Sequence, residues 1–364
     1  MSRPRVLFVG PTRYSLPLSP ALERKWIAIE RQLDYRVLAR LATDCYKGDE
    51  RFELVGGSFY GALPLRVRSA IRTFRPQAIV VEDPRTATLV IAGRVLARGD
   101  KPPVILEVHG NWQHATRLYG STARRLLSPL VDALDEYAVR HADAVRAVSS
   151  YTAGLVERAR GVRPDAVITG YTDVSAFTAR PVQPLPEQPA ALFVGVLEAY
   201  KNVDGLATAW RRAAPRLPGA TLVVVGKGSR HSTIDRLVAD GLAVHLPELS
   251  PEQVAQKLDE STVLVLPSRF EGLGRVVIEA FARGRGVVAS RAGGILDLVE
   301  DGRQGLLVDP EDTDALADAL VRALSDRALA ERLGSAALAS FPDWNQAPDQ
   351  FAERLRALVE GALH

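Results

Sequence analysis

Short apolar runs alternate with helix-like segments along nearly the whole chain of 364 residues, and this alternation limits what the chain can fold into. The runs have the length of buried strands, and the segments between them repeat apolar residues at helical spacing. Such an alternation is typical of parallel sheets whose connecting helices cover both faces. The chain is longer than a single hydrophobic core usually supports, so we expect two domains.

The expected elements are distributed evenly over the two halves of the chain. Strands are expected at 5–10, 35–39, 78–82, 104–108 and 144–148, and then at 191–195, 221–226, 243–246, 263–266 and 286–289. Helices are expected at 21–33, 65–74, 87–97, 123–140, 203–214, 234–240, 251–258, 275–283, 313–324 and 350–359.

A proline-rich segment at 178–189 separates the halves. It carries four prolines without any apolar periodicity, which is typical of an interdomain linker. We therefore predict an N-terminal domain at 1–175 and a C-terminal domain at 190–345. The last helix, within 346–364, could pack on either domain. The expected fold class is α/β, with two doubly wound Rossmann-like domains facing across a cleft at the carboxyl ends of their strands.

Composition narrows the functional classes. The formal net charge of +3 is too small to favour nucleic acid as a partner, and Cys45 is the only cysteine, so disulfides and cysteine metal clusters are excluded. No secretory signal and no apolar run of about 20 residues is present, so we expect a cytoplasmic protein. The basic helix near 65–75 would allow peripheral contact with the inner face of a membrane, although an ordinary surface helix is the more common case.

The most informative motif is a pair of glutamates, Glu271 and Glu279, around the start of an expected helix. Between them, Gly272, Leu273 and Gly274 leave backbone amides free, and such a helix start attracts an anion such as phosphate. Two carboxylates would repel the phosphate itself, but they suit hydroxyl groups on either side of it. The motif therefore predicts a nucleotide-sugar site.

An ordered series of motifs accompanies this pair, at 192–197, 201–204, 222–228, 264–274, 287–294 and 302–312. Together they resemble the retaining family 4 glycosyltransferases, which have the two-domain GT-B fold. The resemblance is close over 190–345 and loose over the first half. It implies transfer of a sugar from a nucleoside diphosphate, UDP- or GDP-linked, to a hydroxyl acceptor, with retention and without metal or further cofactor.

By this resemblance, Glu279 binds the donor ribose and Glu271 lies beside the transferred sugar, while Lys201 reaches the diphosphate. The alternatives are solvated helix acids and a surface lysine. Gly226 would form a tight turn close to the nucleotide. The family pattern places an arginine directly after the glycine that ends the strand at 191–195, where this chain has Val196. Two other residues could replace that cation, Arg275 and Lys227.

The resemblance makes the first half the acceptor side and 190–345 the donor-binding side. In the first half, His109 follows a strand end and is expected to face the cleft. The resemblance places a histidine at this position near the transferred sugar and the acceptor. Its neutral ring could donate a hydrogen bond to a sugar hydroxyl or to the backbone, and a purely structural histidine is the alternative. Asn111 and Trp112 could line the acceptor site, and His114 is a weaker candidate. The pair Asp312 and Asp314 fits a D-x-D metal pattern, but its context before an apolar-periodic helix indicates a helix cap instead.

Three functions remain open at this point. The preferred one is a retaining glycosyltransferase of glycan, glycolipid or glycoside biosynthesis, acting on a glycan, lipid or small-molecule acceptor. The missing arginine at Val196 suggests an alternative, a non-catalytic GT-B-like binding subunit. An NAD-dependent oxidoreductase would also suit two doubly wound domains, but the turn at 226–228 lacks the third glycine of a dinucleotide fingerprint.

Overall fold

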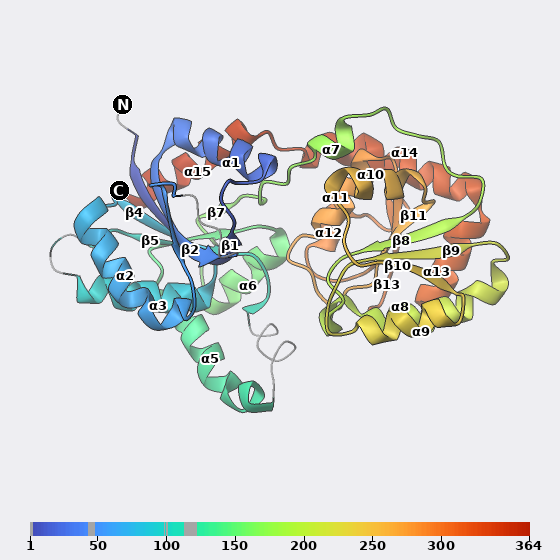
Figure 1. Cartoon of the computed structure of the whole chain (residues 1–364), viewed down its shortest axis with the longest axis horizontal. Helices are drawn as coiled ribbons and strands as arrows, with labels where there is room; N and C mark the ends of the chain where they lie inside the picture. The colour runs from blue at the N-terminus through green and yellow to red at the C-terminus, as the bar shows by residue number, and fades with distance from the viewer. Residues whose placement is uncertain (1–2, 43–47, 98, 100, 113–121) are drawn as a thin grey trace. The chain divides into compact units, whose positions relative to one another are not determined.

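The structure of the protein, a computed structural model, describes residues 3–42, 48–97, 99, 101–112 and 122–364 (Figure 1). The chain divides into two compact units. The first unit comprises Met1–Tyr171 together with Gln346–His364, and the second comprises Thr172–Asn345. None of the helices in the described ranges combines the length and apolar character needed to cross a membrane.

Within the described residues, the first unit is built on a parallel sheet of seven strands in the order β3-β2-β1-β4-β5-β6-β7. The strands are β1 (Arg5–Tyr14), β2 (Asp34–Leu41), β3 (Phe52–Val55), β4 (Ala78–Val81), β5 (Val104–Val108), β6 (Ala144–Ala147) and β7 (Ala166–Val167). Its helices are α1 (Pro20–Gln32), α2 (Phe59–Phe74), α3 (Pro84–Leu96), α5 (Thr122–His141), α6 (Ser150–Arg160) and α15 (Pro348–Ala362).

The second unit repeats this plan with a parallel sheet of six strands in the order β10-β9-β8-β11-β12-β13, again within the described residues. The strands are β8 (Ala190–Val194), β9 (Thr221–Val225), β10 (Ala243–Leu246), β11 (Val263–Leu266), β12 (Gly286–Ser290) and β13 (Gly305–Val308). Its helices are α7 (Ser175–Thr178), η1 (Ala199–Lys201), α8 (Val203–Ala213), η2 (Ala214–Arg216), α9 (His231–Ala239), α10 (Pro251–Asp259), α11 (Arg275–Ala282), α12 (Ile295–Leu298), α13 (Thr313–Ser325) and α14 (Arg327–Trp344).

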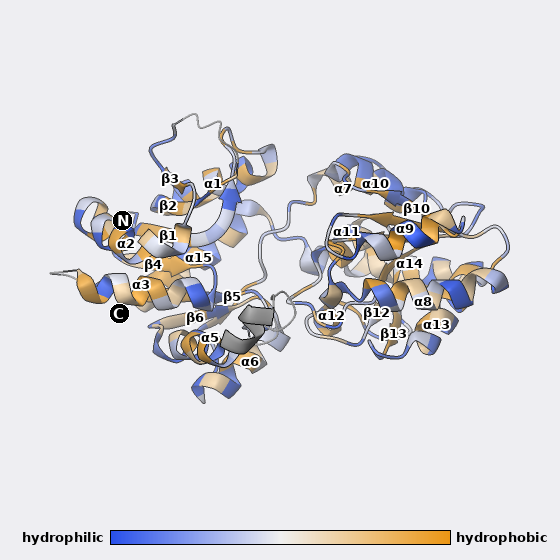
Figure 2. Cartoon of the chain, turned by 60° about the horizontal axis from the view of Figure 1, so that its bottom comes forward, coloured by the Kyte–Doolittle hydropathy of each residue, from blue (hydrophilic) through white to orange (hydrophobic). Residues whose placement is uncertain are grey.

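Each sheet is apolar on both faces because helices cover both. In β1, Leu7 and Val9 join the core beneath α2 and α3, whereas Val6 and Phe8 join the core beneath α1 and α15. Successive side chains of a strand point to opposite faces, so a strand buried on both sides is mostly apolar. The covering helices alternate between hydrophilic and hydrophobic residues, as α8 shows in Figure 2. The two doubly wound sheets expected from the sequence are thus confirmed.

The C-terminal helix α15 packs on the first unit, beside α1 at the other end of the sequence (Figure 1). Phe351, Leu355 and Val359 of α15 are buried in the same core as Trp26 of α1. An ion pair between Arg31 and Asp349 joins the exposed sides of the two helices at 3.0 Å.

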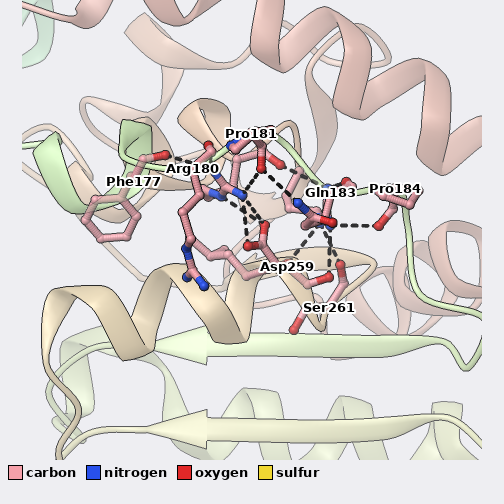
Figure 3. Close-up of polar contacts among 10 residues, drawn as sticks. Phe177, Arg180, Pro181, Gln183, Pro184, Asp259 and Ser261 are labelled. Atoms are coloured by element: carbon pink, nitrogen blue, oxygen red, sulfur yellow. Dashed lines mark hydrogen bonds and ion pairs between the residues drawn. The ribbon is translucent and has the colours of Figure 1, made fainter.

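Two buried arginines hold the proline-rich segment on the second unit (Figure 3). Arg283 and Arg285 lie at the end of α11 and the start of β12, and each is only 1% exposed. Arg283 also pairs with Asp259, which neutralises its charge, and burial lowers the pKa of Arg285 to about 10. Their guanidinium groups donate to the carbonyl oxygens of Phe177, Arg180, Pro181, Gln183 and Pro184. The segment is therefore part of the second unit's surface.

Several elements lie outside the expected list: the short edge strands β3, β7 and β13, and the helices α6 and α14. A glycine and a proline, Gly334 and Pro342, interrupt the pattern of α14 in the sequence. In the structure, Gly334 lets α14 pack tightly, because a Cβ there would lie 2.3 Å from the carbonyl oxygen of Gly284. Gly334 belongs to a residue type that usually weakens a helix, but here its missing side chain allows α14 to contact the turn at Gly284.

Candidate functional site

The second sheet reverses its strand order between β8 and β11. In open α/β sheets, ligands bind at the carboxyl ends of the strands, where the order reverses. The turn η1 follows β8 and ends at Lys201, and the loop after β11 carries Glu271 toward α11. The most informative sequence motif therefore lies at the topological switch point of this unit.

Lys201 and Glu271 form an ion pair at this point. Their side chains are 12% and 10% exposed, so the two charges are largely removed from water. The hydroxyl of the fully buried Ser268 donates to Oε1 of Glu271 at 2.8 Å. The amide of Arg269 donates to the carbonyl oxygen of Tyr200 at 2.8 Å, which ties the two loops together.

The loop from Glu271 to Gly274 rests on a turn of two glycines. The amide of Gly294 donates to the carbonyl oxygen of Glu271 at 2.9 Å. A Cβ on Gly293 would lie 2.1 Å from that oxygen, and one on Gly294 would lie 2.2 Å from the carbonyl oxygen of Gly272. Side chains at either position would displace the loop, so this close backbone approach requires glycine.

Helix α11 starts without a side-chain cap. Its N-cap, Gly274, has φ 90°, a conformation that suits glycine, and Leu273 beside it is buried. The amide of Val277 bonds to the carbonyl oxygen of Gly274 at 2.9 Å. Because no side chain caps this start, the helix end can offer donors to an anion.

Glu279 lies on α11, one turn beyond the exposed Arg275, and is half-buried. Among the described residues, no side chain or backbone group forms a hydrogen bond or ion pair with its carboxylate. Burial raises the pKa of Glu279, and the positive charge of Arg275 opposes this only in part. A carboxylate that is partly removed from water and has no protein partner is costly, so it is well suited to accept hydrogen bonds from a ligand.

Gly226 directly follows β9 and closely approaches Gly195, which directly follows β8. It has φ 146°, and a Cβ there would lie 1.8 Å from the carbonyl oxygen of Gly195. His245 Nε2 lies 2.9 Å from the carbonyl oxygen of Gly226. The neighbouring Lys227 pairs with the exposed Glu248 at 2.5 Å.

The residue at the family's usual arginine position, Val196, is 46% exposed and carries no charge. Of the two candidate substitutes, Lys227 is engaged with Glu248. Arg275 has no hydrogen bond or ion pair with any residue in the described ranges, and it is exposed at the start of α11. The fold thus leaves Arg275 as the available cation of the two.

In the first unit, His109 directly follows β5 and its side chain is 48% exposed. Its Nε2 lies 3.2 Å from Oε2 of Glu107, a residue inside β5. Glu107 also pairs with Arg146 of β6, and both are buried. Burial alone would raise the pKa of Glu107, but Arg146 and His109 hold it well below its usual range.

The remaining sequence candidates fall in different places. Asn111 is buried and donates to the Tyr151 hydroxyl at 3.2 Å. Trp112 is 7% exposed and belongs to the core, so its ring faces other apolar side chains. His114 lies outside the described residues. Asp312 accepts hydrogen bonds from the amides of residues 314 and 315, at 3.1 and 2.8 Å, so the expected helix cap is confirmed.

Sequence reasoning missed three residues that contact the candidates. Ser268 donates to Glu271, Glu107 lies within hydrogen-bond distance of His109, and Arg146 acts on His109 only through its ion pair with Glu107. A signal for the last two was present, because each is the one charged residue within an otherwise apolar strand. A charge in a strand buried on both faces needs a partner, and the two strands are adjacent.

Comparisons with known proteins agree with this architecture. Residues 49–172 match the model of a glycosyl transferase 4-like domain, and residues 188–326 match the model of glycosyl transferases group 1. The chain is 28% identical over 249 residues to the alpha-D-kanosaminyltransferase of Streptomyces kanamyceticus, covering 64% of each chain. It is 31% identical over 264 residues to the D-inositol 3-phosphate glycosyltransferase of Nocardia farcinica, covering 68% of this chain and 54% of that protein. The chain thus matches less than two thirds of the length of either relative.

Solved structures extend the likeness to the whole chain. The sucrose-phosphate synthase of Thermosynechococcus elongatus superposes with a TM-score of 0.79 at 20% identity, over 99% of this chain and 100% of that one. The Anabaena protein HepE in complex with UDP superposes with a TM-score of 0.70 at 18% identity, over 98% and 100% of the two chains. The fold and the matched family models agree with the resemblance seen in the sequence. The chain belongs to the group 1 glycosyltransferases, family 4, and has the GT-B fold.

Proposed function

We propose that the protein is a retaining glycosyltransferase that moves a sugar from a nucleoside diphosphate to a hydroxyl group of an acceptor. The observation that carries the proposal is the arrangement at the β8–β11 switch point. There, Lys201 and Glu271 are paired, and Glu279 lies on the following helix with no hydrogen-bond or ion-pair partner among the residues that the structure describes. Family membership supports the same reading, and HepE was solved with UDP and with UDP-glucose.

The donor diphosphate is proposed to bind between Lys201 and the start of α11. A flexible ammonium suits phosphate oxygens, which gain charge as the sugar leaves. The amides at residues 272–274 add hydrogen-bond donors, and Arg275 supplies the second cation in place of the family's arginine. Gly226 leaves room for the nucleotide beside the end of β9.

The two glutamates are proposed to bind hydroxyl groups on either side of the diphosphate. Glu279 accepts hydrogen bonds from the ribose, which offsets the partial burial of its charge. Glu271 accepts from the hydroxyls of the transferred sugar, and Ser268 fixes the orientation of its carboxylate. His109 is proposed to bind a hydroxyl group of the reacting sugars.

The proposed reaction breaks the bond between the anomeric carbon and the diphosphate oxygen. The acceptor oxygen forms its bond to the same carbon on the same face. The acceptor's proton passes to the leaving diphosphate, so no side chain has to act as a nucleophile or base. The protein's part is to position both substrates and to stabilise the charge that develops on the phosphate. No metal takes part in this proposal, so excess chelator should leave the rate unchanged.

Calorimetric titration with nucleoside diphosphates tests the donor site. A hydrogen bond to a charged group contributes about 1.5–3 kcal/mol, so Glu279→Gln should weaken binding roughly tenfold to a hundredfold. The matched control is Glu300→Gln, an exposed acid of the same unit that pairs with Arg303. Equal affinities of wild type and Glu279→Gln would refute the ribose assignment.

Hydrolysis of UDP- and GDP-sugars by the purified protein separates the enzyme from a non-catalytic binding subunit. A transferase site positions water as a slow substitute for its acceptor, so we expect slow release of the nucleoside diphosphate from one donor. Binding of a nucleotide sugar without any hydrolysis or transfer across the panel would favour the binding subunit. Retention is checked by the anomeric configuration of the product in NMR spectra.

A further inference from the structure

Glu107 and Arg146 form an ion pair within the sheet of the first unit. They are partners in the parallel register of β5 and β6, and they are 8% and 1% exposed. Removing two charges from water is costly, and apolar residues of similar volume often serve stability as well or better. Every other residue of these two strands is apolar. Because stability alone does not explain this buried ion pair, we expect it to have a further role.

The guanidinium of Arg146 is fixed on all sides. Its Nε donates to the carbonyl oxygen of Ile168 at 3.0 Å, and its Nη2 donates to that of Thr169 at 3.1 Å. Its remaining amino group, Nη1, donates to Oε1 of Glu107. The ring of Phe351, on α15, lies 5.1 Å from the guanidinium carbon. Arg146 therefore holds the Glu107 carboxylate in one orientation.

The second oxygen of that carboxylate is directed at His109. Oε2 of Glu107 lies 3.2 Å from Nε2 of the imidazole. An ionised carboxylate can only accept hydrogen bonds, so the proton of this bond must belong to Nε2. In the neutral ring the other nitrogen, Nδ1, is then unprotonated and accepts. Nδ1 has no hydrogen bond with any residue that the structure describes.

We propose that Glu107, anchored by Arg146, is a positioning residue that keeps His109 in the Nε2–H form, so that Nδ1 accepts a hydrogen bond from a substrate hydroxyl. This reverses the expectation that the ring donates to the sugar. The substrate group that binds Nδ1 must then be a hydrogen-bond donor, such as a hydroxyl. The inference rests on the proposed function for the identity of the substrate. Which ring nitrogen of His109 carries the proton does not depend on that function.

Nitrogen NMR of histidine-labelled protein tests the state of the ring without any substrate. His109 is assigned by its loss in a His109→Asn variant. At pH 8 we expect a protonated Nε2 and an unprotonated Nδ1. A protonated Nδ1, in either the other tautomer or the imidazolium, would overturn the proposal. This measurement remains decisive even if the protein transfers no sugar, so the two proposals can fail separately.

The consequence for catalysis is tested by replacing the ion pair as a whole. Glu107→Leu combined with Arg146→Met removes the partner of His109 and leaves no unpaired buried charge, so the fold should survive. We expect kcat to fall about tenfold to a hundredfold, the range found when a metal-binding histidine loses its orienting partner, with the donor KM unchanged. The NMR spectrum of this variant should show His109 as a mixture of tautomers.

A double-mutant cycle separates positioning from a purely structural role. If Glu107 acts through the imidazole, the paired replacement should cost nothing more in a His109→Ala background. An equal fall in kcat with and without His109 would overturn the proposal. A spectrum that still shows only the Nε2–H form in the paired variant would do the same, because Glu107 would then be unnecessary for the tautomer.

Discussion

Asp135 allows a quantitative test of the electrostatics of the first unit. It lies on α5 and is 3% exposed, and its Oδ1 has no hydrogen-bond partner among the described residues. Arg85 reaches its other oxygen only at 3.5 Å. Burial, reinforced by the negative charges of Asp83 and Asp132 and opposed by Arg85, raises the pKa of Asp135 to about 6.

The magnitude follows from the difference between the folded and unfolded states. An ordinary aspartate has a pKa of 3.8, so the shift of roughly two units corresponds to about 3 kcal/mol. The folded-state pKa is the higher one, so Asp135 destabilises the fold only when it is ionised. Below pH 3.8 the carboxyl is protonated in both states and costs the fold nothing. The cost grows as the pH rises and is complete above a pH of about 6. Asp135→Asn should therefore raise the free energy of unfolding by about 3 kcal/mol at pH 8, and by about half as much at pH 5.

Urea unfolding at pH 5 and pH 8, followed for the first unit, measures this difference. In thermal scans, a gain of about 3 kcal/mol should raise Tm by roughly 6–12 °C for a unit of this size. Glu136→Gln is the matched control: it neutralises a neighbouring acid of α5 whose ion pair with Arg140 is partly exposed, so it should change stability by less than about 0.5 kcal/mol. The reasoning is refuted if Asp135→Asn gives no gain at pH 8, or the same gain at both pH values.

Three further predictions concern the second unit. Gly294→Ala should lower Tm and abolish nucleotide binding, because its Cβ would lie 2.2 Å from a backbone oxygen. Gly361→Ala, on α15 of the first unit and with open space around it, should leave nucleotide binding unchanged. Arg283→Met should lower the free energy of unfolding of this unit by about 3–5 kcal/mol in urea, since Asp259 loses its buried partner. A loss below about 1 kcal/mol would show that the buried ion pair between Arg283 and Asp259 contributes little to stability. Lys201→Met should weaken a nucleoside diphosphate at least tenfold in calorimetry and leave the free nucleoside unaffected, and equal losses would place the lysine away from the phosphates.

Much of the second unit could be predicted from sequence because its information is local. The strand at Val263–Leu266, the glycines after it and the apolar-periodic helix occupy one continuous stretch, and each feature constrains the next. Ser268 was in that stretch but carried no signal of its own. Its role depends on Glu271 folding back three residues, and backbone geometry in a loop is not encoded by periodicity.

The first unit was predicted less completely because its contacts are distant in sequence. Glu107 and Arg146 meet across two strands, and Phe351 arrives from the far end of the chain. Edge strands such as Ala166–Val167 are too short to show any period. Trp112, which the sequence allowed as part of an acceptor site, is buried in the core: an aromatic residue after a strand suits a sugar site or a core equally well, and only the packing distinguishes them.

The pairing of Lys201 with Glu271 has a consequence for donor binding. In the free protein each charge satisfies the other, so a diphosphate that draws the ammonium toward itself competes with the carboxylate for its charge. The carboxylate then needs new hydrogen bonds, and the hydroxyls of the transferred sugar can supply them. A nucleoside diphosphate without its sugar gives Lys201 a new partner but leaves Glu271 with the Ser268 hydroxyl and without a cation. Sugar and diphosphate should therefore bind cooperatively, with the complete donor gaining affinity from a buried carboxylate that loses its cation when the free nucleotide binds.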